Sequence, residues 1–126
     1  MMSKLLKAVV EWYYARTIPA RLATGDLCSI KSGDKFAIVK VLSLERDVVH
    51  VRIYKEKFSQ RPTCLDPHEL SLGAIDDPDG FGVGHLPLSR GTFGSWTPIC
   101  IQNDPVTDDE IVWVSEWQKS KGGVWN

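Results

Sequence analysis

The chain has 126 residues, of which 43% are apolar, and it contains five Trp, three Tyr and four Phe. These values predict one globular domain over residues 1–126 with a substantial core, and they exclude a disordered or fibrous protein. A formal net charge of −1 argues against a protein that binds duplex DNA mainly by neutralising phosphates.

The first predicted element is a helix that begins after Ser3 and ends at about Arg16. Apolar side chains recur there at spacings of three and four, namely Leu5, Leu6, Val9, Trp12 and Tyr13. A strand over residues 12–14 is the alternative, and Pro19 ends either element. The apolar run is too short for a signal peptide or a spanning helix, so we expect a soluble protein of the cytoplasm with no membrane partner.

Three strands are predicted next, over residues 27–31, 35–44 and 49–54, with turns at 32–34 and 45–47. In the third strand, apolar residues alternate with polar or aromatic ones at every position. We expect Val49, Val51 and Ile53 to enter the core, and the opposite face to present His50, Arg52 and Tyr54. Bends at Gly25 and Gly33 would curve this sheet into an SH3-like small barrel or meander.

The C-terminal half predicts a short helix that begins at Asp66-Pro67 and ends by Gly73. Residues 76–94 are rich in glycine and are expected to form a long exposed loop, followed by a strand over 96–102. A last helix begins at Thr107, where Glu110 completes a capping box, and ends at Gly122. Its sheet-facing side is expected to hold Ile111, Val114 and Trp117, with Trp113 beside them. The predicted fold class is α+β, a curved antiparallel sheet flanked by an N-terminal and a C-terminal helix.

Charge is distributed unevenly along the chain. Residues 1–61 hold twelve Lys or Arg and six Asp or Glu, whereas residues 62–126 hold three and ten. Such clustering creates local potentials that can attract a partner. The candidate partner-binding residues are therefore those of the basic strand face and of the glycine-rich acidic loop: His50, Arg52, Tyr54, Lys55, Lys57, Arg61, Asp76, Asp77, Asp79, Phe81 and His85.

No motif predicts catalysis or a cofactor. The three histidines, His50, His68 and His85, show no zinc-binding spacing. The loop at 76–80 resembles the start of a calcium site but lacks the late Glu, so we expect an acidic turn and no metal. The three cysteines at 28, 64 and 100 are far apart and form no CxxC pair, which predicts separate buried thiols rather than disulfides or a zinc site.

Several stretches resemble small bacterial immunity proteins of polymorphic-toxin systems. These are GDL at 25–27 and GDKFAIVKVL at 33–42, followed by GHLPLS at 84–89, WTP at 96–98 and PVT at 105–107. The resemblance implies an SH3-like meander in a cytoplasmic protein that binds a cognate toxin and blocks it without turnover. It implies no catalytic residues, and it transfers no binding residues because these vary with the toxin.

Three functions follow from these observations. The first is an immunity protein whose acidic residues at 76–79 and 104–110 fill a basic toxin site, or whose basic strand face meets an acidic toxin surface. The second is a small-barrel nucleic-acid-binding protein, because basic side chains interleaved with Tyr54 can follow a single strand. The third is an enzyme that uses His50 or His85 with a carboxylate, for which the sequence supplies candidates but no geometry.

Overall fold

The computed structural model describes residues 4–6, 9, 18–78, 80–120 and 122–125. The predicted N-terminal helix falls mostly outside these residues, and its described positions 4–6 and 9 are helical. Five strands form one antiparallel sheet in the order β4-β3-β2-β1-β5. They are β1 (Asp26–Ser32), β2 (Lys35–Leu44), β3 (Val48–Phe58), β4 (Val83–Ser89) and β5 (Ile99–Asn103).

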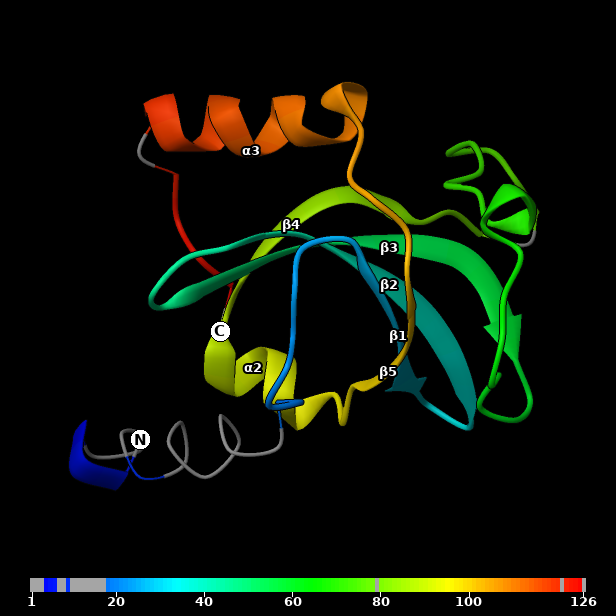
Figure 1. Ribbon diagram of the computed structural model, residues 1–126, viewed down its shortest axis with the longest axis horizontal. Helices are drawn as coiled ribbons and strands as arrows, with labels where there is room; N and C mark the ends of the chain where they lie inside the picture. Colours follow the sequence, from blue (N-terminus) through cyan, green and yellow to red (C-terminus); the bar gives the residue numbers. More distant parts are fainter. Residues whose placement is uncertain (1–3, 7–8, 10–17, 79, 121, 126) are drawn as a thin grey trace.

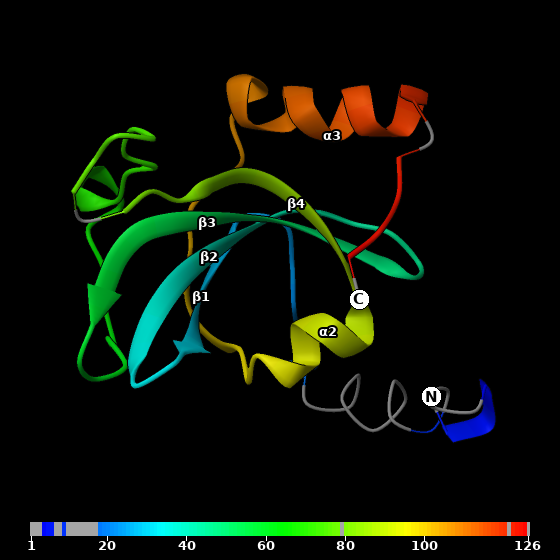
Figure 2. The ribbon, with the colours of Figure 1, turned by 180° about the vertical axis from the view of Figure 1, so that it is seen from behind.

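The sheet is curved but not closed, because β4 and β5 are its two edges. In the described residues after position 18, the helical segments that accompany it are η1 (Pro67–Glu69), α2 (Arg90–Ser95) and α3 (Asp108–Ser120). Figures 1 and 2 show α3 above the convex side of the sheet and α2 on the concave side. The predicted α+β class with a curved antiparallel sheet is confirmed.

The first two hairpins follow the predicted turn chemistry. Gly33 has φ +65° between β1 and β2, a conformation that favours glycine. The turn after β2 closes with a 2.9 Å hydrogen bond from the Glu45 amide to the Val48 carbonyl. Both predicted bounds of β2 are confirmed, and β3 continues four residues beyond the predicted 54, to Phe58.

The concave side of the sheet holds the main core. The predicted apolar face of β3 lies there, and Phe93 of α2 is completely buried against it. Ser89 caps α2, its hydroxyl accepting a 3.2 Å hydrogen bond from the Thr92 amide. The buried members of this cluster are Cys28, Ile30, Ala37, Val39, Val41, Val49, Val51, Leu88 and Phe93.

The expectation of a long loop over 76–94 is wrong, because β4 and α2 occupy most of its second half. The glycine content of residues 76–94, from which a loop was predicted, has a different cause. A Cβ at Gly82 would collide with the Ile53 carbonyl, so glycine at this position permits the close approach of the chain to β3. Two other elements differ in extent: the helix after Asp66 is the single turn η1, and the strand predicted from 96 begins at Ile99.

The C-terminal helix is confirmed with its capping box. The Thr107 amide donates to Glu110 Oε1 at 2.9 Å, and the Glu110 amide donates to Thr107 Oγ1 at 3.3 Å.

In the described part of the chain, no helix is long and apolar enough to cross a bilayer.

Candidate partner-binding surface

The polar face of β3 is covered rather than exposed. His50 and Tyr54 are buried, and Arg52 is mostly buried. Helix α3 and the segment that contains Leu65, Leu70 and Leu72 lie over this face. The predicted alternation of β3 is therefore right, but the prediction that its second face is presented to solvent is wrong.

A buried ion-pair network joins this face to α3. Lys40 of β2 is only 1% exposed, and its ammonium donates to Asp104 Oδ2 at 2.9 Å and to Glu110 Oε1 at 3.0 Å. Arg52 lies 3.4 Å from the other Glu110 oxygen. Burial acts to raise the pKa of Glu110, but hydrogen bonds from Thr107 and Lys40 outweigh it and hold the pKa below its ordinary value. Glu110 thus serves both as helix cap and as anchor of α3.

Two of the three histidines meet under the other end of α3. His50 Nδ1 and His85 Nε2 are 2.9 Å apart, so one imidazole donates to the other. Trp117 packs edge-on against His50, with ring centroids 4.7 Å apart. His50 Nε2 lies 3.3 Å from Glu45 Oε1, an ion-pair distance, and has no hydrogen-bond partner among the described residues. The acid–base role considered for these histidines stays a hypothesis, and His68 stands apart on the surface.

Acid is expected to destabilise the fold through this histidine pair. Burial, and then the proximity of His50, lower the pKa of His85 from 6.5 to about 4. The unfolded chain therefore binds the proton first, so the stability that neutral His85 confers is complete above pH 6.5 and is lost as pH falls towards 4. Urea midpoints measured between these pH values would show the loss. His85→Gln should reduce the change of the urea midpoint with pH, whereas His68→Gln should not. If the midpoint changed equally with pH in both variants, His85 would not be the source of the acid sensitivity.

The remaining basic candidates already have partners within the chain. Lys55 pairs with Asp77 at 2.7 Å, and Lys57 donates to Ser32 Oγ at 3.2 Å. Arg61 donates to the carbonyl and hydroxyl oxygens of Ser29 and Thr97, and it also stacks on the Phe36 ring. Arg61 therefore fastens the segment after β3 to the sheet.

The candidate residues of the acidic loop differ in whether they have a partner. Asp77 is engaged by Lys55, whereas Asp76 and Phe81 are exposed. Asp79 lies outside the described residues. The structure thus brings Lys55 to Asp77 and His50 to His85, and it does not gather the predicted residues into one surface.

A further candidate surface is the outward side of α3. It includes Asp108 and Asp109 of the predicted acidic segment 104–110, and the expectation that Trp113 packs on the sheet beside Val114 is wrong. Trp113 is 58% exposed, and Val112 is also exposed, whereas Val114 is buried against the sheet. At about 100° per residue, Trp113 lies beside the buried stripe and Val112 almost opposite it, so the helical spacing could have revealed both. Three exposed carboxylates share this side of the helix, those of Asp108 and Asp109 about one turn before and that of Glu116 about one turn after, and Glu116 pairs with Lys119 at 3.7 Å. We call Val112, Trp113 and these three carboxylates the α3 outer face.

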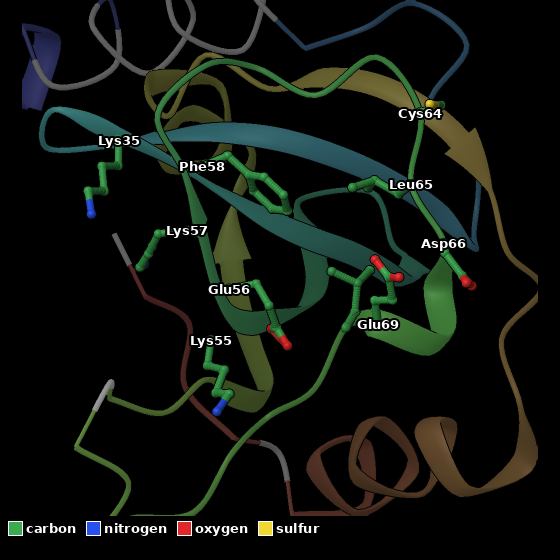
Figure 3. Close-up of a pocket in the computed structure, with 10 residues that line it drawn as sticks. Lys35, Lys55, Glu56, Lys57, Phe58, Cys64, Leu65, Asp66 and Glu69 are labelled. Carbon is green, nitrogen blue, oxygen red and sulfur yellow. The ribbon is translucent and has the colours of Figure 1, made fainter.

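Two hollows lie beside η1. One, of about 390 Å³, opens at the N-terminal end of α3 and is lined by the buried network together with Tyr54, Pro67 and Asp109. The other, of about 540 Å³, lies between the end of β3 and η1. Figure 3 shows its lysines (Lys35, Lys55 and Lys57) on one side and Asp66 and Glu69 on the other, with Glu56 between them. Its charges are balanced, so it favours neither an anion nor a cation.

No group of three or more His, Cys, Asp or Glu side chains in the described ranges is arranged to hold a metal ion. Comparisons with protein-family models, with curated proteins and with solved structures found no match to this chain.

Proposed function

We propose that this protein is an immunity-type binding protein of the cytoplasm that neutralises a cognate toxin, and that the α3 outer face contacts the toxin. The observation that carries the proposal is an exposed tryptophan and valine on the same helix face as three carboxylates, two of which have no ion-pair partner among the described residues. Tryptophan is one of the residue types enriched among binding hot spots, and acidic side chains on the same face complement a basic partner.

The anchoring of α3 supports this assignment. Lys40 holds the first turn through Glu110, and near the other end Gln118 donates to Glu45 at 2.7 Å while Trp117 packs on His50. A helix fixed at both ends loses little conformational freedom when a partner binds its outer face.

The unpaired carboxylates of α3 favour a basic partner. Asp108 and Asp109 have no ion-pair partner among the described residues, whereas the basic candidates Arg52 and Lys55 are paired with carboxylates. Toxins that cleave nucleic acids carry basic active sites, so the acidic helix face is a better match for them than the strand face.

Trp113→Ala is expected to weaken toxin binding about 30-fold or more, because truncation of a central aromatic anchor typically costs at least 2 kcal/mol. The matched control is Trp125→Ala, since Trp125 is 64% exposed and lies outside α3. Binding of the toxin domain encoded by the adjacent gene would be measured by titration calorimetry, with thermal melts of both variants to confirm folding.

Equal affinity of the two variants would contradict the proposed surface. Absence of a complex with the adjacent gene's product at low salt would contradict the immunity function itself. Tight binding of labelled single-stranded RNA that does not depend on Trp113 would favour the nucleic-acid alternative instead.

A further inference from the structure

Two cysteines far apart in the sequence lie side by side in the sheet. Cys28 of β1 and Cys100 of β5 are direct cross-strand partners, and their sulfur atoms are 3.2 Å apart. No disulfide joins them in the structure. The prediction of buried thiols is therefore confirmed for Cys28 and wrong for Cys100 and Cys64, which are exposed. The contact between Cys28 and Cys100 was not predicted.

The backbone geometry suits a disulfide. Directly opposed residues in an antiparallel pair have Cα atoms about 4.5–5.5 Å apart, within the range of about 4.4–6.8 Å that disulfides span. The sulfurs need to approach by only about 1 Å to reach the bonded distance of about 2.05 Å. A register shift lies next to Cys28, and β5 is an edge strand that pairs with β1 alone, so this part of the sheet can adjust.

The pair is also accessible from one side. Cys100 borders a surface hollow of about 320 Å³ that is lined in addition by Arg61, Pro62 and Ile99. Cys28 is fully buried behind it. An oxidant from solvent therefore meets Cys100 first, and Cys28 is positioned to react with whatever forms there.

The geometry points to Cys28 and Cys100 as an oxidisable pair that forms a disulfide on exposure to a hydroperoxide. The Cys100 sulfur attacks the peroxide oxygen, forms a sulfenic acid and releases one water. The Cys28 sulfur then attacks the Cys100 sulfur, and the sulfenic OH group leaves with the Cys28 thiol proton as a second water. In sum, two thiols and one hydrogen peroxide give one disulfide and two waters.

The bond would fasten β5 to the body of the sheet. It joins residues 72 positions apart and so restricts the unfolded chain strongly. Residue 103 ends β5, and Asp104 then leads towards α3, so oxidation secures the segment that holds this helix. Burial raises the pKa of both thiols, so the reaction is expected to accelerate as pH rises.

The test uses the full-length Cys64→Ser variant, which keeps only the pair. After treatment with hydrogen peroxide and alkylation under denaturing conditions, intact mass should show the loss of about two hydrogens and no alkylated thiol. Peptide mapping should recover the linked peptides of Cys28 and Cys100. The melting temperature should rise by roughly 10 °C and return to its starting value with dithiothreitol. Cys64→Ser combined with Cys100→Ser is the control, in which neither change is expected.

Oxygen added to Cys100 while Cys28 still alkylates would overturn the proposal, and so would disulfides that form only between molecules. A linked pair with an unchanged melting temperature would overturn the claim that the bond fastens β5. None of these results depends on the toxin, so they are independent of the proposed function.

Discussion

Lys40→Met is expected to lower the free energy of unfolding by about 3–5 kcal/mol, the cost of removing one partner from a buried ion pair. The ammonium of Lys40 contacts two carboxylates. Without it, the Glu110 carboxylate stays under α3 with only Arg52 and its own cap as partners. Urea unfolding followed by circular dichroism measures the loss, and Lys57→Met is the matched control because Lys57 is exposed on the next strand.

A second variant separates lost charge from lost packing. Lys40→Met combined with Glu110→Gln removes the uncompensated charge and should recover part of the stability. The difference in free energy of unfolding between wild type and Lys40→Met should also decrease as pH falls towards about 4, since an unpaired buried carboxylate readily takes up a proton. Equal stabilities of Lys40→Met and Lys57→Met would show that the pair does not anchor the helix.

Phe93→Ala should be comparably severe, with a loss of about 3–5 kcal/mol. Phe93 is 0% exposed and contributes the buried aromatic ring of α2 to the core on the concave side of the sheet. Truncation leaves a cavity that the closely packed strand residues cannot fill.

Phe81 supplies the control, since its side chain is 56% exposed. Phe81→Ala should change the free energy of unfolding by no more than about 0.5 kcal/mol. Chemical unfolding midpoints and slopes compare the two variants. If Phe93→Ala unfolded at the midpoint of Phe81→Ala, helix α2 would not be part of the cooperative core.

The sequence predicted correctly those elements that neighbouring residues specify by themselves. The alternation from Val49 to Ile53 identified a strand, and Thr107 with Glu110 identified the start of α3. Strand β4 was missed because its pairing with β3 is a long-range interaction, and glycine and proline around it are typical of loops. Pairing with a neighbour outweighed local preference there.

The candidate site was harder to predict, because alternation does not say what covers each face. Ile38 and Leu42 flank Lys40 on the same side of β2, and all three are buried. Apolar residues on both faces of a strand indicate a sheet covered on both sides, so this signal was present in the sequence. The contact between His50 and His85 had no such signal, because it depends on the register of β3 with β4.

The ion pair between Lys40 and Glu110 also bears on the order of events during synthesis. The two residues are 70 positions apart, and Lys40 is translated long before its carboxylate partners. Until residues 104–110 leave the ribosome, the Lys40 ammonium must keep its water, whereas Ile38 beside it packs in a cluster whose other members, such as Leu65 and Leu70, are translated earlier. The part of the convex side that lies under α3 is therefore completed last, and a nascent chain that stops before Asp104 holds Lys40 without its two carboxylate partners.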